Sequence, residues 1–342
     1  MFEHLVRKNI LELIPYSSAR SEFKGVAEVL MDANENPFDH SFNRYPDPMQ
    51  KELKAAIGSY RGIDPKHIFL SNGSDGIIEM IVRTFCEPGK DSISYFTPGF
   101  SMYKVAAKLN AAEVNVFELD ENFGLDEVAF VKNLKENDKL AFITSPNNPT
   151  GNSYSIEQVK YIAANFKGLV VLDEAYVDFS SVPSGISLLD EYPNLIVMQT
   201  FSKAFGAAGI RLGMVFMHEE LVGYLNKVKM PYNIGNNTQQ EALKVLSDTA
   251  RIKEEVSQLI TERKRLEVAL ADHDQIVKVY PSDTNFLLTK FVDSQKVYKF
   301  FLAKSIILRD MSRVKGCENC LRITVGTPEE NDRLLRTLKE LA

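Results

Sequence analysis

The fold is decided by two stretches, Leu169-Val170-Val171-Leu172-Asp173-Glu174-Ala175-Tyr176 and Leu195-Ile196-Val197-Met198-Gln199-Thr200-Phe201-Ser202-Lys203. Each begins as a continuous apolar, largely β-branched run, which is typical of a strand buried on both faces. Each then turns polar. Ligands of open parallel sheets bind beyond the carboxyl ends of the strands, so Asp173 and Lys203 lie where a binding site is expected.

Strands and helices alternate through the part of the chain before Met230. The predicted strands are His67–Ser71, Ser92–Phe96, Glu113–Phe117, Lys139–Thr144, Leu169–Leu172, Leu195–Thr200 and Met214–Met217. Helical patterns lie between most of them, for example at Gly76–Cys86, Ser101–Leu109 and Ile156–Phe166. This alternation predicts an α/β domain with a mostly parallel, seven-stranded sheet.

The pattern changes after Met230-Pro231-Tyr232-Asn233. Thr238–Asp272 reads as one long helix or two nearly continuous ones, and a further helix is predicted at Ser294–Lys304. Short strands are predicted at Ile276–Tyr280, Asn285–Thr289, Ile306–Asp310 and Leu321–Val325. Thr327-Pro328-Glu329-Glu330 carries an N-cap threonine, a proline at the first helical position and a glutamate at the third, which predicts a capping box at the start of the last helix.

We therefore predict three parts. Residues 1–40 form an N-terminal segment that packs with the smaller domain and the pocket. Residues 41–235 form the large domain, and residues 236–342 form a smaller α+β domain.

The bulk composition is that of an ordinary soluble globular protein. The 342 residues are 25% charged and 44% hydrophobic, and the net charge of −6 argues against a nucleic-acid-binding surface. The N-terminus carries charges where a signal peptide needs an apolar core, and no apolar run reaches the ~18 residues that cross a bilayer. We expect a cytoplasmic protein that binds neither nucleic acid nor membrane.

The three cysteines, Cys86, Cys317 and Cys320, are too few for a disulfide framework. A zinc site needs about four ligands, and no second pair accompanies Cys317-Glu318-Asn319-Cys320. The sequence therefore predicts a reduced cysteine pair and no metal.

Lys203 and Asp173 have side chains suited to one cofactor chemistry. A lysine amine can form a Schiff base with pyridoxal phosphate, and an aspartate can keep the pyridinium nitrogen protonated. Taken singly, each residue has an ordinary alternative, a solvated lysine or an aspartate that caps a helix. The order and spacing of several motifs favour the cofactor.

Three of these motifs follow other predicted strands. Asn72-Gly73-Ser74-Asp75-Gly76 precedes a helix, so its backbone N–H groups can bind a phosphate, with a hydroxyl from Ser202 and a fixed charge from Arg211. Phe100 can stack on a planar ring, although a lone aromatic fits a core equally well. Ser145-Pro146-Asn147-Asn148-Pro149-Thr150-Gly151 is rich in residues that favour turns.

With these residues in this order, the chain resembles the fold-type I aminotransferases that depend on pyridoxal phosphate, over essentially its whole length. The resemblance implies an aspartate-aminotransferase-like fold, with Lys203 as the Schiff-base lysine and Asp173 on the pyridine nitrogen. The other implied cofactor contacts are Tyr176 and Asn148 on the ring's phenolic oxygen, Phe100 stacked on the ring, and Gly73, Ser74, Asp75, Ser202 and Arg211 around the phosphate.

The same resemblance concerns Tyr45, in Arg44-Tyr45-Pro46-Asp47-Pro48. It is similar to a family tyrosine that reaches the cofactor phosphate of the neighbouring subunit. The resemblance therefore implies a homodimer with shared active sites.

The two ends of the chain resemble the histidinol-phosphate aminotransferases within that family. The motifs are Arg7–Ile10, Pro15–Arg20 and Asp32–Pro37 at one end and Ile307–Asp310 and Cys317–Thr327 at the other. The implied reaction moves an amino group from histidinol phosphate to 2-oxoglutarate, giving imidazole-acetol phosphate and glutamate. The implied contacts with these small anionic substrates are Arg322 and Arg309, with Tyr16 and Asn34 as lid or pocket residues.

Two departures and several alternatives accompany this interpretation. Gly76 stands where an acidic residue is frequent, and Met311 where a larger polar one is common. An internal salt bridge is the ordinary alternative for both Arg309 and Arg322. An aromatic amino-acid aminotransferase and a phospho-amino-acid decarboxylase share much of the pattern. A non-catalytic regulator of the same fold is disfavoured, because no catalytic group is missing and no DNA-binding domain is appended.

Overall fold

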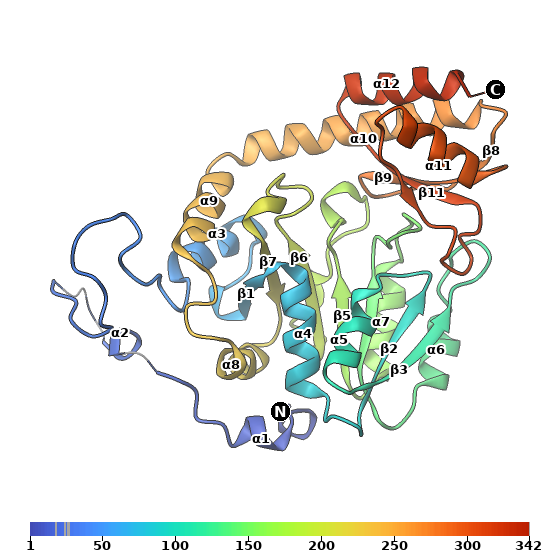
Figure 1. Ribbon diagram of the computed structural model, residues 1–342. Coiled ribbons are helices and arrows are strands. Elements are labelled where there is room, and N and C mark those ends of the chain that lie inside the picture. The colour runs from blue at the N-terminus through green and yellow to red at the C-terminus, as the bar shows by residue number, and fades with distance from the viewer. Residues whose placement is uncertain (18, 24, 26–27, 342) are drawn as a thin grey trace.

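The computed structural model describes residues 1–17, 19–23, 25 and 28–341, so that Ser18 of the N-terminal motif lies outside the described part (Figure 1). At its centre is a seven-stranded sheet with the order β1-β7-β6-β5-β4-β2-β3. The strands are β1 (Ile68–Asn72), β2 (Ser92–Thr97), β3 (Glu113–Glu118), β4 (Asp138–Thr144), β5 (Leu169–Asp173), β6 (Leu195–Thr200) and β7 (Leu212–Phe216). The parallel pairs are β2–β3, β2–β4, β4–β5 and β5–β6. Strand β7 lies between β6 and β1 and is antiparallel to both. The predicted mostly parallel α/β sheet is confirmed.

Helices cover both faces of this sheet. Along β5, Val170 and Leu172 belong to one hydrophobic core and Val171 to the other, as side-chain alternation requires. The core with Val171 is covered by α4 (Gly73–Phe85), α5 (Met102–Leu109) and α8 (Glu219–Val228). The opposite core is covered by α3 (Lys51–Arg61), α6 (Glu127–Asn133) and α7 (Ile156–Asn165). The strands are buried on both faces, which explains their continuous apolar sequence.

A smaller, fully antiparallel sheet with the order β10-β11-β9-β8 follows in the chain. Its strands are β8 (Ile276–Val279), β9 (Phe286–Phe291), β10 (Arg309–Asp310) and β11 (Cys320–Thr324). The helices of this half are α9 (Asn236–Leu246), α10 (Thr249–Ala271), α11 (Ser294–Ala303) and α12 (Pro328–Lys339). In Figure 1, α10 leads from the large sheet to the small one.

Two local predictions are settled here. The capping box at Thr327 and Glu330 is present at the start of α12. The predicted strand Ile306–Asp310 was too long, because Ser305 has a left-handed φ of 59° and the N–H of Ile306 bonds back to the carbonyl of Phe301. That N–H completes the end of α11, so strand pairing begins only at Arg309.

The N-terminus packs differently from the prediction. Phe2 just before η1 (Glu3–Leu5), Leu5 at its end and Ile10 of α1 (Lys8–Leu11) are buried in the core beneath α8. These residues therefore join the large domain and not the small one. The described residues of the range 12–50 (12–17, 19–23, 25 and 28–50), which we call the arm, include α2 (Ala19–Glu22) and loop away from the sheets in Figure 1. The three domain boundaries stay a prediction.

Short 3-10 helices complete the described part at η2 (Pro65–His67), η3 (Val177–Phe179), η4 (Gly185–Leu188) and η5 (Ala208–Ile210). Among the helices of residues 1–17, 19–23, 25 and 28–341, none combines the length and apolarity that a membrane crossing needs.

Candidate active site

Asp173 is the last residue of β5, and its carboxylate is almost completely buried. Its Oδ1 accepts a hydrogen bond from the Ala175 N–H at 3.1 Å, and its Oδ2 accepts one from the Tyr103 hydroxyl at 2.7 Å. Burial raises the pKa of Asp173 to about 6, while these two hydrogen bonds act to lower it. The carboxylate is therefore held in place by donors that favour its charged form.

Tyr103 is a site residue that sequence reasoning missed. Its hydroxyl also lies 2.7 Å from Oγ1 of Thr144, at the end of β4. A phenol has one hydrogen, and this one is donated to Asp173, so the Thr144 hydroxyl donates to Tyr103. The sequence offered no signal for this role, because an aromatic side chain within a helix is normally part of a core.

Lys203 lies in the turn after β6, with its Nζ 5.5 Å from the centroid of the Tyr176 ring. Burial lowers the pKa of Lys203, and the positive charge of Arg322 lowers it further. Tyr176 is itself 6% exposed, and burial raises its pKa to about 12. The lysine is thus a partly desolvated amine beside a neutral phenol.

The start of α4 and the strand β7 meet so closely that only glycine fits. Gly73 has a φ of 68°, and a Cβ added to it would lie 2.7 Å from Nη2 of Arg211. A Cβ added to Gly213 would lie 2.5 Å from the backbone carbon of Gly73. Arg211 also reaches Oδ2 of Asp75 at 3.3 Å. This end of the pocket therefore combines helix N–H groups with a fixed cation, which suits an anion.

Arg309 and Arg322 are cross-strand partners on β10 and β11 of the small sheet. Arg322 donates to Oδ1 of Asn148, and its guanidinium carbon lies 5.2 Å from the centroid of the Phe286 ring. None of the ion pairs among the described residues includes either arginine. The alternative of an internal salt bridge is therefore wrong for both in this structure.

One cavity of about 440 Å³ joins these groups. The predicted site residues that line it are Ser74, Asp75, Phe100, Asn148, Asp173, Tyr176, Ser202, Lys203, Arg211, Arg309 and Arg322. Gly73 is not among the lining residues, but it lies against the guanidinium of Arg211, which lines the cavity. Residues that the prediction did not assign to the site also line the cavity, among them Thr144, Thr200 and Met311.

Three predicted residues lie elsewhere. Tyr45 and Asn34 line a second cavity of about 570 Å³, and Tyr16 lines a third of about 200 Å³. The Tyr45 ring stacks on Tyr232 with 4.4 Å between the centroids. Within one chain, these three residues are therefore not brought together with Lys203.

The cysteines lie outside this cavity, and all three are buried and free. Burial raises the pKa of Cys317 to about 12 and that of Cys320 to about 11. Within the described part, no group of three or more His, Cys, Asp or Glu side chains could hold a metal ion.

The family model "Aminotransferase class I and II" matches residues 16–338. The chain belongs to this family of aminotransferases. A curated histidinol-phosphate aminotransferase of Parabacteroides distasonis is 49% identical over 337 residues, which are 98% of each chain. The chain thus groups with the histidinol-phosphate aminotransferases.

Solved structures agree with this family and fold. The histidinol-phosphate aminotransferase from Clostridium acetobutylicum superposes with a TM-score of 0.81 at 25% identity, covering 88% of this chain and 91% of that one. The histidinol-phosphate aminotransferase from Sinorhizobium meliloti, solved in complex with pyridoxal-5'-phosphate, gives a TM-score of 0.78 at 25% identity, covering 87% of this chain and 84% of that one.

Proposed function

We propose that this aminotransferase moves the amino group of histidinol phosphate to 2-oxoglutarate with pyridoxal phosphate as cofactor, giving imidazole-acetol phosphate and glutamate. The observation that supports this reaction most directly is that one cavity is lined by Lys203, the buried Asp173 and the two arginines of the small sheet. The names of the relatives support the choice of substrate. A location in the cytoplasm stays a prediction.

The residues present fit the cofactor. Gly73 and Gly213 leave backbone N–H groups and the Arg211 guanidinium at one end, where no Cβ could be accommodated and an anion is favoured. Phosphate would be held there by Gly73, Ser74, Asp75, Ser202 and Arg211. Asp173 lies deep in the same cavity, where a carboxylate can pair with a ring nitrogen.

When bound, the cofactor supplies a reactive carbonyl and a ring that accepts electrons. Lys203 provides the amine that takes the proton from the Cα of the substrate, and its lowered pKa favours the uncharged form that this needs. Asp173 keeps the ring nitrogen protonated. Phe100 would stack on the ring, and Asn148 and Tyr176 would bind its phenolic oxygen, since all three line the cavity.

The substrate end of the cavity belongs to Arg322 and Arg309. Histidinol phosphate and 2-oxoglutarate each carry an anion away from the reacting carbon, and a planar guanidinium binds phosphate and carboxylate alike. Because Arg322 already contacts Asn148, substrate binding and cofactor binding share one hydrogen-bonded group. Ping-pong kinetics should follow from a different feature: both substrates use this one cavity in turn, and the first product leaves before the second substrate binds.

We extend the proposal to a homodimer in which Tyr45 of one copy reaches the cofactor phosphate of the other, while Tyr16 and Asn34 serve as lid or pocket contacts. Tyr45 is 51% exposed and does not line the cavity of Lys203. The arm also exposes large apolar side chains, with Ile14 at 90%, Met31 at 91% and Phe38 at 70%. These apolar side chains are available to be covered by a second copy of the chain.

The test is a spectral titration of the cofactor-loaded protein with histidinol phosphate, phenylalanine and threonine phosphate. We expect histidinol phosphate to change the cofactor absorbance fastest, and the Lys203→Ala protein to show no turnover. A faster response to phenylalanine would identify an aromatic amino-acid aminotransferase. Loss of CO2 from threonine phosphate would identify a decarboxylase.

A further inference from the structure

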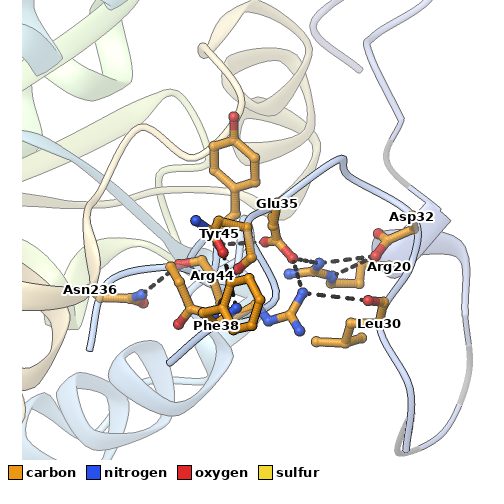
Figure 2. Close-up of polar contacts among 10 residues, drawn as sticks. Arg20, Leu30, Asp32, Glu35, Phe38, Arg44, Tyr45 and Asn236 are labelled. Atoms are coloured by element: carbon orange, nitrogen blue, oxygen red, sulfur yellow. Dashed lines mark hydrogen bonds and ion pairs between the residues drawn. The ribbon is translucent and has the colours of Figure 1, made fainter. Parts of the chain in front are cut away.

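The carboxylate of Glu35 connects three parts of the arm through hydrogen bonds (Figure 2). Its Oε2 accepts hydrogen bonds from Nη2 of Arg20 at 2.5 Å and from Nη1 of Arg44 at 2.8 Å. Its Oε1 accepts the backbone N–H of Tyr45 at 2.7 Å. One carboxylate therefore holds two guanidinium groups and the backbone of the tyrosine.

This carboxylate is buried although the arm around it is exposed. The side chain of Glu35 is 3% exposed, against 18% for Arg20 and 35% for Arg44. The hydrogen bond from Arg20 is the largest cause that lowers the pKa of Glu35, to about 2. Glu35 is thus charged throughout the neutral range, and bonds between two charged partners are the stronger kind.

The cluster is also anchored to the body of the protein. The Arg44 carbonyl accepts a hydrogen bond from Nδ2 of Asn236, the first residue of α9, at 3.0 Å. The Tyr45 ring stacks on Tyr232 with 14° between the ring planes. In Figure 2 the ring points away from the Glu35 carboxylate, while the backbone N–H faces it. Glu35 thus fixes the backbone of Tyr45, and Tyr232 fixes the plane of its ring.

We propose that Glu35 is a positioning residue for Tyr45, and that it sets the direction in which the Tyr45 hydroxyl meets the cofactor phosphate of a second copy of this chain. The proposal rests on the proposed function, because that assigns Tyr45 to the site of the partner. A purely local role, in which Glu35 only folds the arm, makes different predictions for coupling and for mixed dimers.

The first experiment is a double-mutant cycle, read as the dissociation constant of pyridoxal phosphate from the full-length protein. We expect Tyr45→Phe and Glu35→Ala each to weaken binding about tenfold, and the double variant to be no weaker than about twice either single one. Glu35→Gln keeps the volume and one acceptor but leaves Arg44 without a counter-charge and Arg20 with that of Asp32 alone, so about a threefold loss is expected. Glu28→Ala, an exposed glutamate of the same arm, is the matched control and should leave the constant unchanged.

Three outcomes of this cycle decide the matter. Fully additive losses in the double variant would overturn the positioning role, as would an unchanged constant for Glu35→Ala beside a weakened Tyr45→Phe. An unchanged constant for Tyr45→Phe would overturn both this inference and the contact in trans. Thermal unfolding of each variant separates these results from loss of the fold.

The second experiment mixes subunits. Glu35→Ala subunits combined with Lys203→Ala subunits should regain activity, because an intact arm then serves the site that keeps its lysine. Recovery to about a quarter of the wild-type rate is expected at low cofactor concentration from random pairing, against the low rate of either variant alone. If Glu35 acts only within its own subunit, the mixture shows no gain and the inference fails.

Discussion

Tyr103 donates a hydrogen bond of 2.7 Å to Oδ2 of Asp173, and both side chains are buried. The two residues come from α5 and from the end of β5, on neighbouring layers of the large domain. The charges that also act on this carboxylate are Asp75, which raises its pKa, and Lys203, which lowers it. Tyr103 thus helps to keep the carboxylate ionised in a site where burial works against ionisation.

Replacing Tyr103 with Phe should therefore raise the pKa of Asp173 and move the acid limb of the pH–rate profile upward by about one pH unit, since a hydrogen bond to a charged group contributes about 1.5 kcal/mol. The loss in kcat should be larger at pH 6 than at pH 8. Tyr95→Phe, which removes a hydroxyl from a ring packed against Tyr103, is the control. An equal loss at every pH would contradict this role.

The raised pKa of Asp173 also predicts how the stability of the cofactor-free protein depends on pH. Its folded-state pKa of about 6 lies above the ordinary 3.8, so the native state binds a proton in that window that the unfolded state has lost. The contribution of Asp173 to the free energy of unfolding is therefore favourable at low pH and is lost as the pH rises through about 6.

Asp173→Asn should accordingly raise the free energy of unfolding at pH 8, by up to about 3 kcal/mol, and change it little at pH 4. Urea unfolding at the two pH values measures this difference. The neighbouring Glu174, whose pKa burial raises to about 6, is present in both proteins and cancels. A variant less stable than the wild type at pH 8 would contradict the argument.

The contact between Gly213 and Gly73 predicts a matched pair of variants. Gly213→Ala places a Cβ 2.5 Å from the backbone of Gly73, so it should cost about 1–3 kcal/mol of stability and weaken cofactor binding. Gly223→Ala, in α8, meets no atom within 4 Å and should add up to about 1 kcal/mol. Both effects are measured by chemical unfolding, and similar values for the two would show that the contact is not tight.

Arg322→Lys should raise the KM for both substrates about tenfold, because a lysine cannot reproduce the fork that holds an anion while it contacts Asn148. Arg313→Lys, an exposed arginine in the loop between β10 and β11, serves as the control. A change confined to one substrate would show that the other is bound elsewhere, and steady-state kinetics with each substrate decides this.

The apolar runs predicted the buried strands well, because a strand that is buried on both faces has apolar residues at nearly every position and stands out in the sequence. The direction of β7 could not be predicted, since an antiparallel strand inside a sheet covered on both faces has the same apolar run as its parallel neighbours. Lys203 and Asp173 were found because they follow strands directly. Tyr103 was not, because its contact with Asp173 depends on how α5 packs.

The structure of the arm was harder to predict from the sequence than that of the strands. Its residues form few apolar contacts with their own chain, so hydrophobic periodicity carries little information there. Tyr16, Asn34 and Tyr45 were found only through resemblance, and their roles stay predictions. Glu35 lies within the motif Asp32–Pro37, but that motif assigned it no role, and only the geometry of Arg20 and Arg44 around it distinguishes it from a surface glutamate.

The helix α10 has a mechanical consequence. Its 23 residues make a rod about 35 Å long, with the junction Ser247–Asp248 at one end and the small sheet at the other. A tilt of roughly 5° at that junction displaces the far end by roughly 3 Å. Because Arg309 and Arg322 belong to the small sheet while Lys203 follows β6 of the large sheet, such a tilt would change the width of the cavity between them. Substrate size could therefore be re-tuned by substitutions at the α9–α10 junction, without altering a single residue that lines the cavity.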